Sequence, residues 1–260
     1  MATPSGSRAM RNELVLYAVQ GSVARLTLND PDRANVLSEP MMAALSEALA
    51  TAEAAPEVRV IVLAAAGRIF CAGHDLSELR SSEEAQAHRA LFDRCSSLMM
   101  ALVACRVPVI ARVQGAAVAA GCQLVASCDL AYASQNARFA VSGIDLGLFC
   151  STPGVALGRA VGRKAASEML LTGRFIDAAR AAELGLINAA VPPERLDAAV
   201  DEAALAIAGK APDAVALGKA VFRRQIEAPL EDAYAIASRA MVENLGFESA
   251  KAGIDGFLRR

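Results

Sequence analysis

Hydrophobic and polar residues alternate at the start of the chain with the period of a β-strand. Residues 14–19 and 23–28 both show this alternation, and the turn-prone pair Gln20-Gly21 lies between them. Two such runs joined by a short turn predict a hairpin. Apolar residues then recur at helical spacing after Ser38, which predicts a helix to about Ala54, because serine is a favoured helix cap.

Two dense β-branched runs follow, at residues 58–64 and 109–113. Continuous apolar runs of this length are typical of strands buried on both faces. The polar-apolar period between them predicts a long helix from about Glu83 to Cys105, which Pro108 terminates. Small residues from Gly115 onward predict a helix to about Cys128. Short strands are then expected at residues 130–133 and 138–141.

After about Val155 the chain consists of Ala- and Leu-rich segments with helical spacing and no convincing strand. We therefore predict an α/β core over residues 1–195, followed by a C-terminal helical region over residues 196–260. The apolar faces of residues 200–208 and 233–245 suit burial, either against other subunits or against the core.

Composition excludes two classes of partner. The net charge is -2, aromatic residues make up 4% of the chain and Trp is absent, which is unlike a surface that binds nucleic acid through basic and stacking side chains. The longest apolar stretch, Val107–Ser127, is interrupted by Arg112, Gln114 and Gln123, so we expect no membrane span.

The six cysteines mostly occupy apolar runs, which is typical of buried thiols in a reducing compartment. The first residues lack the apolar segment of a secretory signal. Both observations favour a cytoplasmic location, or an organelle matrix if the source is a eukaryote.

Two junctions carry small residues where backbone can approach a ligand closely. The first is Ala72-Gly73-His74-Asp75, soon after a buried strand. The second runs through Ala119-Ala120-Gly121 into a helix, whose first N–H groups lack acceptors within the helix and attract negative charge. We expect an anion, or an oxygen that gains charge during a reaction, to bind there.

These junctions, together with the Asn29-x-Pro31 and Asn35-Val36-Leu37 segments, resemble the enoyl-CoA hydratase/isomerase (crotonase) superfamily. The sequences that carry the resemblance are FCAGHDL at 70–76 and QGAAVAAGCQLVASCDL at 114–130. The resemblance implies a ClpP/crotonase ββα spiral core and a C-terminal region that assembles a homotrimer or a dimer of trimers. It also implies an acyl-CoA thioester substrate, with coenzyme A as part of that substrate and no separate cofactor. The GCQLVASCDL segment resembles one branch of the family in particular.

By this resemblance, the main-chain N–H groups of His74 and Ala120 form an oxyanion hole for the thioester oxygen. Such donors stabilise the charge that develops on that oxygen in an enolate-like state. The expected substrate-binding residues are Ala72, His74, Asp75, Leu76, Ser77, Ala120 and Gly121.

The chain departs from the family where hydratases carry two catalytic glutamates, because those positions are Gln123 and Gly143 here. An amide transfers no proton at neutral pH, and glycine has no side chain, so ordinary hydration is doubtful. An AGHD loop with His74 also resembles decarboxylases of malonyl-type thioesters. Three alternatives therefore stay open, namely a hydratase or isomerase, a decarboxylase that uses His74, and an acyl-CoA binder without catalysis.

Other polar residues have weaker functional interpretations. Cys71-x-x-His74-Asp75 lacks a second pair of ligands, so no metal site is expected. Cys150 lacks a neighbouring base that would make it a nucleophile. Glu39 and Glu47 lie on a helix with no evident partner, and His88 is interpreted as a residue on a solvated helix face.

Overall fold

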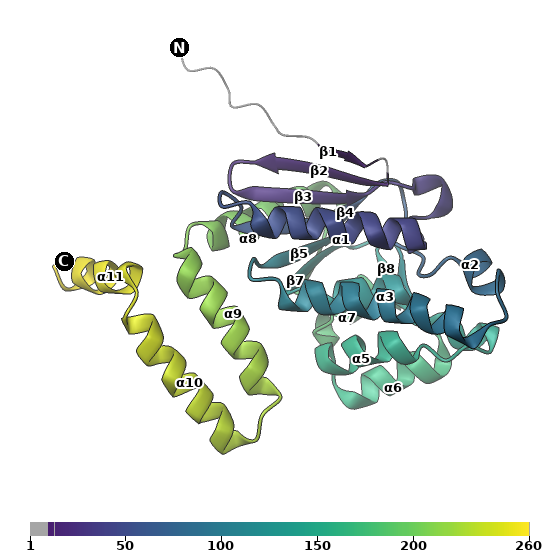
Figure 1. Ribbon diagram of the computed structural model, residues 1–260. Coiled ribbons are helices and arrows are strands. Elements are labelled where there is room, and N and C mark those ends of the chain that lie inside the picture. The colour runs from purple at the N-terminus through teal and green to yellow at the C-terminus, as the bar shows by residue number, and fades with distance from the viewer. Residues whose placement is uncertain (1–9, 13, 260) are drawn as a thin grey trace, which may run out of the picture.

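A seven-stranded sheet built from distant parts of the chain lies at the centre of the fold (Figure 1). The computed structural model describes residues 10–12 and 14–259. Along the sheet the strands run in the order β1-β2-β3-β4-β5-β7-β10. Their bounds are Met10–Asn12, Val15–Gln20, Val23–Leu28, Val60–Ala65, Val109–Val113, Leu130–Ser134 and Ala189–Val191. A smaller three-stranded sheet contains β6, β8 and β9, at Ala117–Val118, Arg138–Ala140 and Ile176–Asp177.

The predicted hairpin opens the sheet. Strands β2 and β3 pair antiparallel from Val15↔Leu28 to Gln20↔Val23, and Gly21 adopts a φ of +59° in the turn. From β3 onward the pairings β3–β4, β4–β5, β5–β7 and β7–β10 are parallel. The side chains of β4 are buried along its whole length, which confirms the strand predicted from its β-branched run.

Helices connect and cover these strands. The α-helices are α1 Glu39–Ala54, α2 Leu76–Arg80, α3 Ala85–Ala104, α4 Ala120–Ser127, α5 Ser151–Ala160, α6 Arg163–Thr172, α7 Ala178–Leu184, α8 Leu196–Ala208, α9 Pro212–Ile226, α10 Leu230–Leu245 and α11 Glu248–Leu258. Three short 3-10 helices are η1 Pro31–Arg33, η2 Ser142–Leu146 and η3 Pro193–Arg195. Ser38 caps α1 by accepting a hydrogen bond from the Met41 N–H, as its position before the helix predicts.

The two faces of the large sheet are covered by different helices. Ile61 and Leu63 point into the main core, which also contains the apolar faces of α1 and α3. Val60 and Val62 point to the opposite face and pack with Val200 of α8. The alternation along β4 therefore buries its side chains in two separate cores.

Two details differ from the sequence prediction. Strand β6 interrupts the helix predicted from Gly115, so α4 begins only at Ala120. Beyond Val155, where no strand was expected, β9 and β10 are present, and β10 extends the large sheet beside β7. These strands have two and three residues, too few to show a period.

The C-terminal helices fall into two groups. Helix α8 begins at the predicted boundary, Leu196, but it packs on the large sheet. Helices α9, α10 and α11 extend away from the sheet as an arm (Figure 1). We call these three helices the C-terminal arm. Its large exposed apolar side chains are Phe222, Ile226, Leu230, Tyr234, Met241, Val242, Leu245, Ile254, Phe257 and Leu258.

Within the described residues, no helix is long and apolar enough to cross a membrane. All six cysteines are free thiols, and five of them are buried. Burial raises the pKa of Cys71 and of Cys122 to about 12, so these thiols stay protonated at neutral pH. The prediction about a secretory signal concerns the first residues, and residues 1–9 lie outside the described part of the chain.

One ion pair attaches the C-terminal arm to the sheet. Lys219 of α9 reaches Asp129 at 2.5 Å and the Val107 carbonyl at 3.2 Å, and its side chain is 7% exposed. Asp129 also accepts the Val109 N–H at 2.7 Å. The Lys219 side chain is buried but Asp129 is exposed, so loss of Lys219 removes a charge-assisted hydrogen bond and leaves the Asp129 carboxylate in contact with water.

We predict that Lys219→Ala lowers the free energy of unfolding by about 1–2 kcal/mol. Chemical denaturation followed by circular dichroism measures this change. Lys164→Ala, at an exposed position of α6, is the matched control and is expected to change the free energy by less than about 0.5 kcal/mol. Equal effects of the two substitutions would contradict this account of the attachment.

Candidate active site

The two junctions singled out in the sequence lie side by side. Residues Cys71 and Ala117 form an isolated parallel bridge. The Phe70 N–H donates to the Ala116 carbonyl at 3.0 Å, and the Val118 N–H donates to the Cys71 carbonyl at 2.9 Å. Main-chain hydrogen bonds therefore hold the AGHD loop against the segment that leads into α4.

Glycine at position 121 allows α4 to start against this loop. A Cβ added at Gly121 would lie 2.2 Å from the Cys71 carbonyl oxygen, far inside contact distance. Ala119, directly before the helix, adopts φ 50° and ψ -116°, a conformation that is strained for a residue with a side chain. The Ala119 N–H is held by the Ala140 carbonyl at 2.8 Å. The surrounding contacts thus impose a sharp turn into α4.

The AGHD loop meets the first amide of α4 at Gly73. Gly73 adopts a φ of +97°, and its Cβ position would lie 3.0 Å from the Ala119 Cβ and 3.4 Å from the Ala120 nitrogen. In the described part of the chain, neither the His74 N–H nor the Ala120 N–H donates to an acceptor. Ala120 is the first residue of an eight-residue helix, so its amide lies at the positive end of the helix dipole.

Loops on both sides hold this arrangement. The Asn35 side chain donates to the carbonyls of Ala66 and Ile69 at 2.9 and 2.8 Å and accepts the Asp30 N–H at 2.9 Å. The Leu37 N–H donates to the Gly73 carbonyl at 2.8 Å. These bonds explain why the Asn35-Val36-Leu37 segment accompanies the AGHD loop in the sequence.

Asp75 fixes the residues that follow the loop, as predicted. Its carboxylate accepts the Ser77 N–H at 2.9 Å and the Ser77 hydroxyl at 2.6 Å, and it forms an ion pair with Arg33. The Ser77 hydrogen bond and, more weakly, the Arg33 charge hold the pKa of Asp75 below its ordinary value. Asp75 therefore serves as the cap of α2, while Leu76 and Ser77 are exposed beside it.

The His74 ring is fixed in one tautomer by its neighbours. Its Nδ1 lies 3.4 Å from the Leu37 carbonyl, and the ring contacts the edge of Phe92 at 5.6 Å between centroids. A carbonyl oxygen only accepts hydrogen bonds, so in the neutral ring the proton resides on Nδ1 and Nε2 keeps its lone pair. Nε2 is buried and has no partner among the described residues. Burial lowers the pKa of His74 from its ordinary value of 6.5, which favours the neutral ring at pH 7.

Gln123 lies three residues after Ala120 on α4, on the same side of the helix. It is 4% exposed, and its Oε1 has no hydrogen-bond partner in the described structure. A buried amide oxygen without a partner is unfavourable by about 1–3 kcal/mol, unless a bound molecule supplies a donor. Gln123 therefore has the properties of a residue that contacts a ligand.

Gly143 leaves no room for a side chain. A Cβ added there would lie 2.4 Å from the Leu148 carbonyl oxygen and 2.7 Å from the Cys150 sulfur. The Gly143 N–H instead contacts the Cys150 sulfur at 3.3 Å. Burial raises the pKa of Cys150, so this thiol is unsuited to act as a nucleophile.

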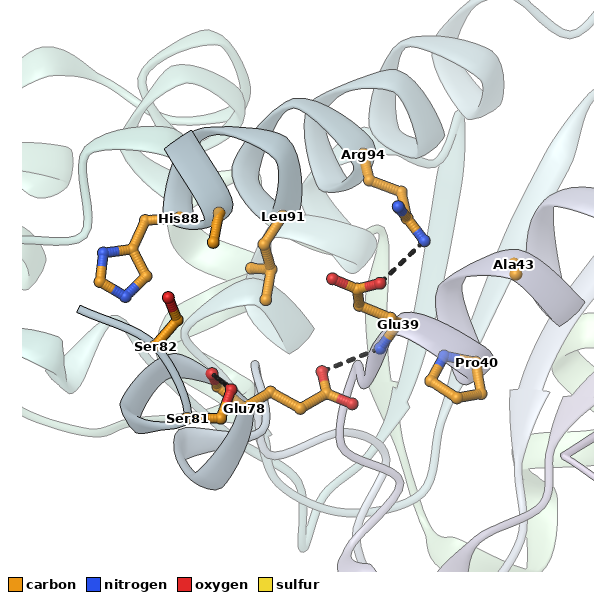
Figure 2. A pocket seen from close by; sticks show the side chains of 10 residues that line it. Glu39, Pro40, Ala43, Glu78, Ser81, Ser82, His88, Leu91 and Arg94 are labelled. Atoms are coloured by element: carbon orange, nitrogen blue, oxygen red, sulfur yellow. Dashed lines mark hydrogen bonds and ion pairs between the residues drawn. The ribbon is translucent and has the colours of Figure 1, made fainter. Parts of the chain in front are cut away.

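A cavity of about 520 Å³ lies between α1, α2 and α3 (Figure 2). The prediction that Glu39 has no partner is wrong, because Arg94 bonds its carboxylate at 3.0 Å. His88 is also not simply solvated, since its Nε2 lies 3.0 Å from the Leu79 carbonyl and it lines the cavity. The sequence prediction missed Glu78 and Arg94, because both lie far along the chain from Glu39, which each of them contacts. Among the described residues, no group of three or more His, Cys, Asp or Glu is arranged to hold a metal ion.

A sequence profile described as "Enoyl-CoA hydratase/isomerase" matches residues 18–260. The chain belongs to the enoyl-CoA hydratase/isomerase (crotonase) family. It is 43% identical over 256 residues to "Enoyl-CoA hydratase domain-containing protein 3, mitochondrial" of Xenopus laevis, covering 98% of this chain and 87% of that protein. The mouse protein of the same name is 42% identical, and the match covers 100% of this chain and 86% of the mouse protein. The branch indicated by GCQLVASCDL is thus confirmed.

Solved structures confirm the crotonase fold. An enoyl-CoA hydratase from Mycobacterium smegmatis is 52% identical with a TM-score of 0.93, covering 95% of this chain and 96% of that one. Human enoyl-CoA hydratase domain-containing protein 3 is 41% identical with a TM-score of 0.92, and the match covers 95% of this chain and 97% of the human chain. The chain is therefore similar in fold along nearly its whole length to members of this family.

We predict that Gly121→Ala disrupts the junction, because the added methyl group would overlap the Cys71 carbonyl. The expected loss in the free energy of unfolding is about 1–3 kcal/mol. Denaturant melts of the variant measure it.

Gly158→Ala provides the control, because a Cβ at this position of α5 meets nothing within 4 Å. An added methyl group in an open helix position is expected to stabilise the protein by about 0.5–1 kcal/mol. A Gly121→Ala variant as stable as Gly158→Ala would show that the close approach has no consequence.

Proposed function

We propose that the chain binds an acyl-CoA thioester with its carbonyl oxygen between the His74 and Ala120 main-chain N–H groups. The observation that supports the proposal is that Gly73, directly before His74, packs against the start of α4 at Ala120, while neither the His74 nor the Ala120 amide donates to an acceptor among the described residues. Coenzyme A enters as part of the substrate, and no separate cofactor is invoked.

The reaction best supported by these residues forms an enolate. When a C–H bond beside the thioester carbonyl breaks, its electron pair moves toward the carbonyl and the oxygen gains negative charge. The two N–H groups bind that charge more strongly than the neutral carbonyl. A single donor of this kind contributes about 10²–10³ in rate.

His74 Nε2 is the proposed proton acceptor for this step. Its lone pair is available because Nδ1–H faces the Leu37 carbonyl, and burial keeps the ring neutral. For a 3-enoyl thioester, Nε2 takes a proton from the carbon next to the carbonyl, this proton exchanges with solvent, and Nε2 then delivers a proton to the carbon two positions further on. The double bond then moves into conjugation with the carbonyl, which is an isomerase reaction. Hydration with two carboxylates lacks support, because Gln123 and Gly143 occupy those positions.

Decarboxylation of a malonyl-type thioester is the second candidate. In this reaction a C–C bond breaks, carbon dioxide leaves and the electron pair moves to the thioester carbonyl, so no base is required. Gln123 and Gly143 favour this candidate, because a neutral amide and a glycine do not repel the substrate carboxylate as two glutamates would. The third possibility, binding without catalysis, requires that neither reaction occurs.

A deuterium-exchange experiment distinguishes these candidates. The protein is incubated in D₂O with a 3-enoyl thioester and, separately, with a malonyl-type thioester, and products are followed by mass spectrometry. We expect label in the enoyl product. Release of carbon dioxide alone would select the decarboxylase, binding without either reaction would select the binder, and failure to bind any thioester would contradict the proposal.

We predict that His74→Gln lowers the exchange rate about 10²–10⁴-fold, because it removes the base. The main-chain N–H is kept, so thioester affinity should stay within a few-fold. In the unsubstituted protein the rate is expected to be level at neutral pH and to fall only below pH 6.5, because the base form persists down to the lowered pKa. A pH–rate profile checks this, and an unchanged rate in His74→Gln would exclude His74 as the base.

We also propose that the chain forms a homotrimer or a dimer of trimers through its C-terminal arm. The exposed apolar side chains of α9, α10 and α11 support this, because few monomers leave so many uncovered in one region. A cytoplasmic location, or an organelle matrix in a eukaryote, is part of the proposal, and the vertebrate relatives named mitochondrial support the matrix.

Light scattering tests the assembly. We predict that Val242→Asp, at a position 72% exposed on α10, shifts the mass toward that of one chain. Leu16→Asp, at a position 41% exposed on β2 and outside the arm, is the control and should leave the mass unchanged. A monomeric unsubstituted protein would contradict this part of the proposal.

A further inference from the structure

The cavity between α1, α2 and α3 has a polar wall that the proposed reaction does not use. Three charged residues from three helices meet there, namely Glu39 of α1, Glu78 of α2 and Arg94 of α3. Figure 2 shows the Glu39 carboxylate turned toward Arg94 and the Glu78 carboxylate turned toward the Glu39 main-chain nitrogen. The remaining lining residues include Ser81, Ser82, His88 and Leu91.

Each carboxylate uses one oxygen within the protein. Glu39 Oε2 forms an ion pair with Arg94 at 3.0 Å, and Glu78 Oε2 accepts a hydrogen bond from the Glu39 N–H at 2.9 Å. The second oxygen of each, Oε1, has no partner among the described residues. The formal charges of the two carboxylates and the guanidinium leave the wall with one excess negative charge. Its free groups therefore suit a hydrogen-bond donor.

The cavity and the proposed oxyanion hole share two segments of chain. Helix α1 begins two residues after Leu37, whose N–H bonds the Gly73 carbonyl at 2.8 Å. Helix α2 begins two residues after His74, and Glu78 lies in its first turn. Glu78 lies four positions after His74 in the sequence, so their Cα atoms are at most roughly 15 Å apart.

An unsubstituted alkyl group in this cavity would remove water from the carboxylates and offer no hydrogen bond in return, which is unfavourable. A hydroxyl or an ammonium group would donate to the two free oxygens. We infer that the cavity receives the far end of the acyl group and selects acyl groups that end in a hydrogen-bond donor over plain alkyl groups. This inference rests on the thioester binding proposed above.

Three thioesters of equal chain length test the selection: hexanoyl-CoA, ω-hydroxyhexanoyl-CoA and ω-aminohexanoyl-CoA. Their dissociation constants are measured with the full chain by isothermal titration calorimetry. At least one donor-terminated thioester is expected to bind about tenfold more tightly than hexanoyl-CoA, the effect of one charge-assisted hydrogen bond. If only the amino thioester binds more tightly than hexanoyl-CoA, charge is the main contribution to the selectivity. If both donor-terminated thioesters bind more tightly, hydrogen bonding is the main contribution.

Two glutamine substitutions assign the effect to this wall. Glu78→Gln keeps an oxygen that accepts the Glu39 N–H but removes the charge, so the preference for donor-terminated thioesters should be lost. Should this variant fail to fold, Glu39→Gln is the second choice, because its bond to Arg94 is a surface ion pair that contributes little to stability. Glu47→Gln changes the same charge on α1 at an exposed position outside the cavity and should keep the preference.

The outcomes separate this inference from the proposed function. If hexanoyl-CoA binds and the donor-terminated thioesters bind no better, the cavity selects no donor and the inference is wrong. If the preference persists in both Glu78→Gln and Glu39→Gln, it arises elsewhere and the inference is also wrong. If none of the three thioesters binds, the proposed function itself fails.

Discussion

The site depends on one steric constraint, the contact between the start of α4 and the Cys71 carbonyl. Because Gly121 has no side chain, the helix comes close enough for the Ala120 amide to lie beside Gly73. The strained Ala119 backbone and the positive φ of Gly73 follow from the same approach. The core therefore supplies the energy that holds these conformations, since each is unfavourable in isolation. Any change that moves α4 away from the loop removes both amides from their positions together.

Most of the core could be predicted from hydrophobic patterns, because its main strands have five or six residues. That length is enough to show either an alternation of polar and apolar residues or a continuous apolar run. The runs at 58–64 and 109–113 correspond closely to β4 and β5. Strand β10 could not be predicted, because three small residues that are partly buried leave no pattern. The late start of α4 was also hidden, since alanine is compatible with both the strand β6 and the helix. Main-chain pairing across the fold decides between them.

Some features of the candidate site could be predicted from the sequence and others could not. The segments that carry the His74 and Ala120 amides were found because glycine and alanine at a strand end indicate close backbone approach. The tautomer of His74 was hidden, because it depends on the Leu37 carbonyl, which lies 37 residues away in the sequence. The partners of Glu39 were hidden for the same reason. Gly143 differs again, because the structure explains its lack of a side chain by the packing of Leu148 and Cys150.

The oxyanion hole proposed here consists of backbone atoms, and this affects how the protein can change. A substitution at position 74 or 120 replaces a side chain and leaves the amide in place, so an alanine scan would not detect the oxyanion hole. Diversity at these two positions is therefore open to selection for new chemistry, with the charge-stabilising groups retained throughout. Loss of the hole instead requires altered packing at the glycines, where a single added methyl group would displace the main chain that carries both amides.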